Sequence, residues 1–164
     1  MGYILLNSLY LYQSNSLNNI MDKPVYNPDT FFNWIELEVR FRDLDPLRHV
    51  NNSVFNSYFE EGRVQFVGQI PEFDHSVQQG KSFVLVHISI DYIKPIQYGE
   101  TVLVGSAMKE LGNSSVNGFQ AIYSKETKEL KAVAESIGVW FDLKKNRPVR
   151  LPEIKDPGKY LYKS

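Results

Sequence analysis

The segment from residue 43 to residue 52 concentrates side chains that can carry out acid–base and polar chemistry. It reads Asp-Leu-Asp-Pro-Leu-Arg-His-Val-Asn-Asn, and so holds two carboxylates, a guanidinium, an imidazole and two carboxamides. Asp45 can attack a carbonyl carbon or activate a water molecule. His49 can orient that water or pass a proton. Asn51 and Asn52 offer neutral hydrogen bonds that position a substrate without adding charge.

The helix that must follow this segment supplies a second chemical element. From Ser53 to Ile70, apolar residues recur at three- and four-residue steps, which predicts an amphipathic helix of about seventeen residues. The free N–H groups at a helix start carry partial positive charge. A carbonyl oxygen placed there would be stabilised as in an oxyanion hole. A carboxylate beside such amides suits the hydrolysis of an activated acyl group.

Each of these side chains also has an ordinary structural interpretation. Asp43 or Asp45 can end a strand or form an Asx-turn. His49 can serve as a structural hydrogen-bonding group, and Asn51 and Asn52 are typical helix caps. We take Asp45 as the chemical group and Asp43 as the structural member of the pair. The spacing of His and Asp here matches no metal-binding motif, so we expect no metal and no redox cofactor.

The surrounding pattern predicts the elements that position this segment. Residues 34–42 alternate between apolar and charged side chains, which is typical of a strand with one buried face. Residues 71–81 are expected to form a loop. Four further strands are predicted at residues 82–93, 101–110, 116–124 and 130–143. One long helix among about five strands predicts an α+β fold in which a curved antiparallel sheet wraps a central helix.

Composition narrows the possible classes. The 164 residues suit a single domain, which we assign to residues 31–164; residues 1–30, uncharged as far as Ile20, are expected to be a poorly ordered extension. Lys and Arg total 18 against 19 Asp and Glu, which argues against a nucleic-acid binder. The absence of cysteine excludes disulfides and cysteine nucleophiles and fits a cytoplasmic protein. No apolar run reaches the length of a membrane-spanning helix, so no membrane insertion is expected.

The run from Asp43 to Arg63 resembles the signature of the hot-dog-fold acyl-CoA thioesterases, of the 4-hydroxybenzoyl-CoA thioesterase and YbgC type. Residues 91–100 and 147–152 resemble two further segments of that family. The resemblance covers about residues 31–153. It implies a hot-dog fold, a homodimer or homotetramer, and hydrolysis of an acyl-CoA to a free carboxylic acid and CoA without a cofactor.

The resemblance also implies roles for individual residues. The family's catalytic aspartate falls on Asp45, and the amide that polarises the thioester carbonyl falls near Asn52. His49 matches the histidine of the related plant acyl-carrier-protein thioesterases, which share the pattern Asp-x-x-x-His-Val-Asn-Asn. Those plant enzymes carry an asparagine where this chain has Leu47. YbgC-type members carry a histidine where this chain has Asn52.

Substrate contacts are expected from a second set of residues. Arg48, Lys81 and Arg150 are candidates for the CoA phosphates, Asn51 for positioning the substrate, and Glu60 matches a carboxylate of the family's central helix. Two alternatives stay open. One is an acyl-carrier-protein thioesterase, which would need a basic docking patch for its acidic partner. The other is a non-catalytic binder of acyl-CoA or lipid on the same fold.

Overall fold

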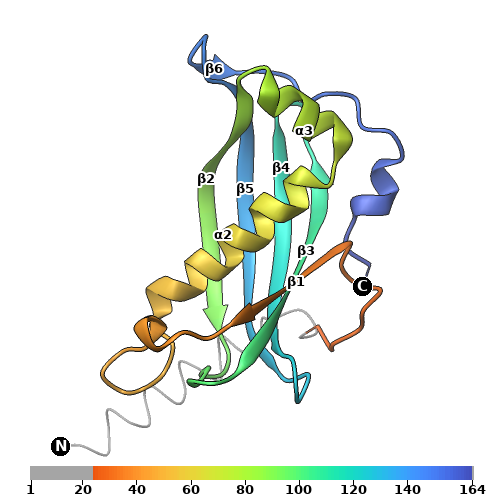
Figure 1. Cartoon of the computed structure of the whole chain (residues 1–164). Coiled ribbons are helices and arrows are strands. Elements are labelled where there is room, and N and C mark those ends of the chain that lie inside the picture. The colour runs from red at the N-terminus through yellow and green to blue at the C-terminus, as the bar shows by residue number, and fades with distance from the viewer. Residues whose placement is uncertain (1–23, 164) are drawn as a thin grey trace, which may run out of the picture.

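One antiparallel sheet forms the body of the molecule, and the computed structural model describes residues 24–163 of it. Five strands follow the order β1-β3-β4-β5-β2, and a short sixth strand, β6, pairs with β5 (Figure 1). The strands are β1 (Asn33–Glu38), β2 (Lys81–Tyr92), β3 (Thr101–Leu111), β4 (Ser115–Ser124), β5 (Leu130–Asp142) and β6 (Arg147–Pro148). The helical elements are η1 (Phe41–Asp43), α2 (Asn52–Gly68), α3 (Pro71–Gln78) and η2 (Pro157–Tyr160).

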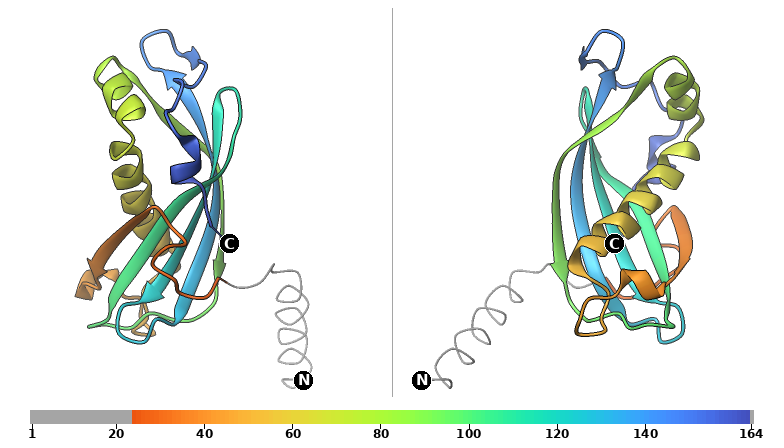
Figure 2. Two further views of the ribbon diagram at one scale, coloured as in Figure 1. Left: turned by 90° about the vertical axis from the view of Figure 1, so that its right-hand side faces the viewer. Right: turned by 60° about the vertical axis from the view of Figure 1, so that its left-hand side comes forward.

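The sheet curves around α2, which lies along its concave face (Figures 1 and 2). The helix buries the aromatic stripe of Phe55, Tyr58, Phe59 and Phe66 against the strands. Gly62 marks the closest approach, because a Cβ atom there would lie 2.8 Å from the side-chain nitrogen of Gln120. The expected α+β hot-dog arrangement, with a long helix wrapped by a curved antiparallel sheet, is confirmed.

The helix α3 replaces the loop expected at residues 71–81, so that expectation is wrong. Pro71 stands at the first helical position, where a missing N–H is harmless and a fixed φ favours the helix. Glu72 and Asp74 lie in the first turn, where negative charge is stabilised by the helix dipole. Pro71 therefore begins a second helix shortly after α2 ends at Gly68.

Two strands depart from the regular alternation of their sequences. β1 ends at Glu38 rather than at Arg42, and Phe41, expected on the buried face, lies exposed in η1. In β2 the pairing with β5 shifts between Leu85 and His87, which is the mark of a β-bulge. The bulge reverses which side chains face the helix, so Phe83 before it and Ile88 after it both pack into the core.

The two ends of the described chain lie against the sheet. Residues 1–23 of the expected extension lie outside the described residues. Residues 24–30 contact the sheet: the ring of Tyr26 packs on Trp34 and Tyr123, and Thr30 is buried. At the other end, Tyr160 is buried, and Tyr162 donates its backbone N–H to the carbonyl of Met108 at 2.7 Å. The folded part thus reaches further toward the N-terminus than residue 31.

Candidate active site

The loop between β1 and α2 is a small antiparallel hairpin. Its arms are joined by hydrogen bonds from the Asn51 N–H to the Asp43 carbonyl at 2.9 Å and from the Asp45 N–H to the His49 carbonyl at 2.8 Å. At its tip, Arg48 has a φ of 63°, in the left-handed region. The Val50 N–H donates to the carbonyl of Ile96 at 2.8 Å, which ties the loop to the segment that follows β2. The loop is therefore held on both sides.

The start of α2 presents the backbone N–H of Asn52. Asn51 is the N-cap: its Oδ1 accepts from the Ser53 N–H at 2.9 Å, and its carbonyl accepts from the Val54 N–H at 2.8 Å. Within residues 24–163 the Asn52 N–H has no hydrogen-bond partner. It lies at the positive end of a seventeen-residue helix. The Asn52 amide is thus able to donate to the oxygen of a bound carbonyl group.

The two oxygens of the Asp45 carboxylate differ in their hydrogen bonding. Oδ1 accepts from the Leu47 N–H at 2.8 Å and from the His49 N–H at 3.2 Å, which is the Asx-turn that the sequence allowed. Oδ2 makes no hydrogen bond within the described part of the chain. The structure also places no hydrogen bond between this carboxylate and the His49 ring. One oxygen therefore fixes the side chain while the other remains available for chemistry.

Asp43, two residues earlier, is buried and is hydrogen-bonded through one of its two oxygens. Only 3% of it is exposed, and its Oδ2 accepts from the Tyr58 hydroxyl at 2.9 Å, the Arg40 backbone N–H at 3.0 Å and the Arg40 guanidinium at 3.2 Å. Burial by itself would raise the pKa of Asp43, but the hydrogen bonds from Arg40 and Tyr58 outweigh it and hold that pKa below its ordinary value. The pKa of the Tyr58 hydroxyl is raised by burial and by its bond to Asp43.

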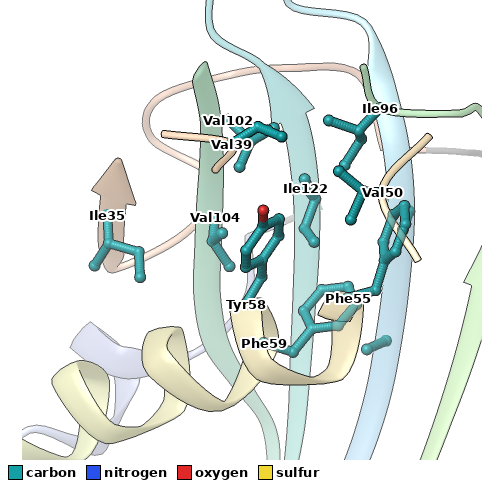
Figure 3. Close-up of a cluster of buried hydrophobic side chains, with 12 residues drawn as sticks. Ile35, Val39, Val50, Phe55, Tyr58, Phe59, Ile96, Val102, Val104 and Ile122 are labelled. Carbon is teal, nitrogen blue, oxygen red and sulfur yellow. The ribbon is translucent and has the colours of Figure 1, made fainter. Parts of the chain in front are cut away.

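The loop packs through Val50 against a cluster of buried hydrophobic side chains (Figure 3). Val50 from the loop and Ile96 from the segment after β2 face Phe55 of α2, and the Tyr58 ring stands between Val39 and Val104. Sequence reasoning missed Tyr92, which packs edge-on against Phe55 and donates its hydroxyl to the Asn52 carbonyl at 3.2 Å. The only signal for it was its place in the segment 91–100. Tyr92 thus adds a contact from β2 at the start of α2.

The other predicted site residues lie in different places. Arg48 is exposed at the loop tip, and Arg150 is exposed near the C-terminal tail. Lys81 begins β2 and pairs with Asp142, whereas Tyr92 at the other end of the strand touches Asn52. At about 3.3 Å per residue the twelve-residue strand separates these ends by roughly 36 Å. The structure does not bring Lys81 to Asp45 of the same chain.

Glu60 lines a cavity of about 420 Å³ between the helices and the sheet. Most of its wall is apolar and includes Phe66, Phe73 and Met108. Its polar lining combines the exposed acids Glu60 and Asp74 with Arg63, Ser82, Ser106, Gln120 and Ser136. No spacing in the sequence relates the residues that line this cavity, because its wall comes from six separate elements.

Residues 24–163 contain no group of three His, Cys, Asp or Glu side chains placed to hold a metal ion. Within the same range, no helix is both long and apolar enough to span a lipid bilayer.

Comparison with known proteins gives a consistent family. The model of the thioesterase-like superfamily matches residues 39–155. A chloroplastic acyl-acyl carrier protein thioesterase of Arabidopsis thaliana is 28% identical over 122 residues, which cover 74% of this chain but only 64% of that protein's length. The long-chain acyl-CoA thioesterase FadM of Escherichia coli is 27% identical over 116 residues, covering 71% of this chain and 88% of that protein.

A solved structure agrees with these sequence relatives. A thioesterase of Thermus thermophilus, solved in complex with coenzyme A and zinc, is 37% identical. The match covers 74% of this chain and 91% of that chain, with a TM-score of 0.64.

Proposed function

This chain belongs to the thioesterase-like superfamily, and from that membership we propose that it hydrolyses acyl-CoA thioesters to a free carboxylic acid and CoA. The observation that carries the proposal is the pairing, on one loop, of a carboxylate with a free oxygen and a helix N-terminus with a free amide. These are Asp45 Oδ2 and the Asn52 N–H. Thioester hydrolysis needs both groups, because the carbonyl must be polarised and then attacked.

The Asn52 N–H donates a hydrogen bond to the thioester oxygen, which gains negative charge as the carbonyl carbon is attacked. In one route Asp45 Oδ2 takes a proton from water, and the resulting hydroxide attacks the carbon. In the other route Oδ2 attacks directly, and water then hydrolyses the mixed anhydride formed on Asp45. In both routes the C–S bond breaks and CoA leaves as a thiolate that takes up a proton.

Four further side chains have roles in this proposal. The His49 ring is not hydrogen-bonded to Asp45, so we assign it to orienting the attacking water rather than to activating the carboxylate. Asn51 holds the first turn of α2 and so aims the Asn52 amide. Arg48 is exposed at the loop tip, where its guanidinium is free to meet a CoA phosphate. Glu60 lines the cavity rather than the Asp45 loop, so we place it beside the acyl group.

The test is Asp45→Asn, assayed by thiol release across a panel of acyl-CoAs. Asparagine keeps the shape and the Oδ1 acceptor but can neither attack nor take a proton, so kcat should fall by about a thousandfold. Asp29→Asn, an exposed aspartate outside the loop, is the matched control and should keep full activity. Thermal melting of both variants checks the fold. Wild-type turnover by Asp45→Asn would remove the catalytic assignment of Asp45, whereas binding of acyl-CoA by the wild-type protein without thiol release would indicate a non-catalytic acyl-CoA or lipid binder.

A carrier-protein thioester is a second candidate substrate, because two relatives named as acyl-acyl carrier protein thioesterases match 74% of this chain. The chain spans 64% of the length of each of those proteins. Rates on acyl-CoA and on acyl carrier protein with the same acyl group would separate the two substrates. A higher kcat/KM on the acyl carrier protein would favour the carrier-protein substrate.

Because a chain without cysteine gains nothing from an oxidising compartment, we place the protein in the cytoplasm.

We further propose that the protein works as a homodimer or a homotetramer built on β2. Within the described residues β2 pairs only with β5, so its outer edge carries unpaired backbone groups. Three successive apolar residues on it are exposed: Val84, Leu85 and Val86. A second copy that adds its own β2 to this edge would pair those groups and cover the apolar side chains.

Val86→Lys tests this assembly, because 58% of Val86 is exposed and a lysine at a sheet edge opposes strand pairing. Light scattering after size exclusion should report a monomer. Val25→Lys, at a site that is 83% exposed and away from β2, should leave the oligomer intact. An unchanged oligomer in Val86→Lys would show that β2 is not the contact.

A further inference from the structure

The cavity under α2 has a polar cluster set into an otherwise apolar wall. The cluster consists of Arg63 from α2, Ser106 from β3, Gln120 from β4 and Ser136 from β5, and all four line the cavity. Ser106, Gln120 and Ser136 are at least 94% buried. Burying polar side chains in a helix–sheet interface is unfavourable unless their hydrogen bonds are satisfied. The hydrogen bonds that these side chains make within the protein therefore show which of their polar groups remain available to a ligand.

Gln120 is held in one orientation by three hydrogen bonds. Its Nε2 donates to the Phe59 carbonyl at 2.9 Å and to the Ser106 Oγ at 2.8 Å, and its Oε1 accepts from Arg63 Nη1 at 3.2 Å. Both N–H groups of the carboxamide are therefore used within the protein. Because Ser106 Oγ acts as the acceptor from Gln120, its own O–H remains able to donate. Gln120 thus serves to fix its two neighbours, Arg63 and Ser106, at the cavity wall.

Arg63 carries a positive charge that the described residues do not pair. No carboxylate among residues 24–163 lies within ion-pair distance of its guanidinium. Its single hydrogen bond goes to Gln120, so most of its five N–H donors are unused. Desolvation lowers the pKa of Arg63, and the nearby charge of Glu60 acts against that shift. The Ser136 hydroxyl likewise makes no hydrogen bond within the described range.

The cluster therefore offers mainly donors: the unused N–H groups of Arg63 and the O–H groups of Ser106 and Ser136, whose oxygens can also accept. A plain hydrocarbon chain cannot satisfy them, and it would strip water from them on entry. We propose that the cavity selects an acyl group that carries an acceptor oxygen, as a ketone or carboxylate, on its chain. This inference rests on the proposed thioesterase function and names the substrate class of that site.

The position of the cavity indicates which part of the acyl group it receives. Its nearest lining residue on α2, Glu60, lies eight residues beyond Asn52, or about 12 Å along the helix axis at 1.5 Å per residue. An extended chain gains roughly 1.2 Å per bond, so about ten bonds separate the thioester carbon from the cavity. The acceptor oxygen therefore lies toward the far end of the chain.

The experiment compares three CoA thioesters of the same chain length: dodecanoyl-CoA, 11-oxododecanoyl-CoA and the CoA monothioester of dodecanedioic acid. The wild-type protein should prefer at least one oxygenated substrate over dodecanoyl-CoA by about tenfold in kcat/KM, since a hydrogen bond from a charged donor discriminates on that scale. The ketone and the carboxylate arms distinguish the two acceptor types. Equal kcat/KM on all three substrates would overturn the inference while leaving the proposed function standing.

Two variants test whether the polar cluster causes the preference for oxygenated acyl chains. Arg63→Met keeps an unbranched but shorter side chain and removes the donors, and Ser106→Ala removes one hydroxyl. Each should lower the ratio of kcat/KM for the oxygenated chain to kcat/KM for dodecanoyl-CoA, and Arg63→Met should lower that ratio to about one. Arg147→Met, on exposed β6, is the matched control and should keep the preference. A preference that survives in Arg63→Met would overturn the assignment.

A binding measurement separates this inference from the proposed function. Calorimetric titration with free 11-oxododecanoic, dodecanedioic and dodecanoic acids reports on the cavity without any hydrolysis. At least one oxygenated acid should bind wild-type protein about tenfold more tightly than dodecanoic acid, and that advantage should disappear in Arg63→Met. If no thioester were hydrolysed but this difference held, the proposed function would fail and the cavity's selectivity would stand. Equal affinities for all three acids would overturn the proposed selectivity of the cavity.

Discussion

The two faces of the loop before α2 carry carboxylates only two residues apart in very different settings. On the inner face, Asp43 is buried and accepts three hydrogen bonds on one oxygen. On the outer face, Asp45 is half-buried and accepts two backbone hydrogen bonds on Oδ1, while Oδ2 is free within the described residues. The inner carboxylate stabilises the fold and the outer one is available to a substrate. A single hairpin thus separates stability from chemistry by turning one acid inward and the next outward.

The largest expected difference between the two carboxylates is in stability, and replacing each aspartate by alanine measures it. Asp43→Ala leaves the Tyr58 hydroxyl and the Arg40 groups without their acceptor and should lower the free energy of unfolding by about 3 kcal/mol. Asp45→Ala removes two hydrogen bonds at a partly exposed turn and should lower it by about 1 kcal/mol. Urea titrations at neutral pH measure both. Equal losses in the two variants would mean that the two faces do not differ in this way.

The pH dependence of stability sharpens the same contrast. The pKa of Asp43 is lower in the folded protein than its ordinary value near 4, so the unfolded chain takes up a proton first as the pH falls. The stability that Asp43 contributes is therefore complete above about pH 4, and it is lost as the pH falls through the lower, folded pKa. Asp43→Asn should be less stable than wild type at pH 7 and should lose less free energy of unfolding between pH 5 and pH 2. Parallel curves for the two proteins would assign the acid sensitivity to other groups.

The smallest expected effect concerns the turn that separates the two faces. Arg48 has a φ of 63°, a conformation that is strained for residues with a Cβ atom. Arg48→Gly should relieve this strain and raise the free energy of unfolding by about 0.5 kcal/mol, after the greater chain entropy of glycine is subtracted. Arg42→Gly, at an exposed position in η1, is the control and should be destabilising. A loss of stability in Arg48→Gly would mean that the arginine side chain, and not the backbone, decides the turn.

Local patterns in the sequence determined most of the elements and the candidate loop. The three- and four-residue spacing of Phe55, Tyr58 and Phe59 gave α2 almost to the residue, since that spacing depends only on helix geometry. The cap was readable for the same reason, because Asn51 acts on a neighbour two residues away. The choice of Asp43 as the structural acid agrees with its three hydrogen bonds. The catalytic roles of Asp45, His49 and Asn52 stay predictions.

The tertiary structure alone decided what depends on residues far apart in the chain. The bulge in β2 reverses the faces that simple alternation assigned, and it exists only in the pairing with β5. Residues 71–81 were expected to form a loop, but packing of Phe73 against Trp140 favours a second helix that begins at Pro71. The cavity joins Arg63, Ser106 and Gln120 from three elements, and no spacing in the sequence relates them. Periodicity encodes which face of an element is buried, whereas the register between strands and the approach of the helix decide which buried side chains meet.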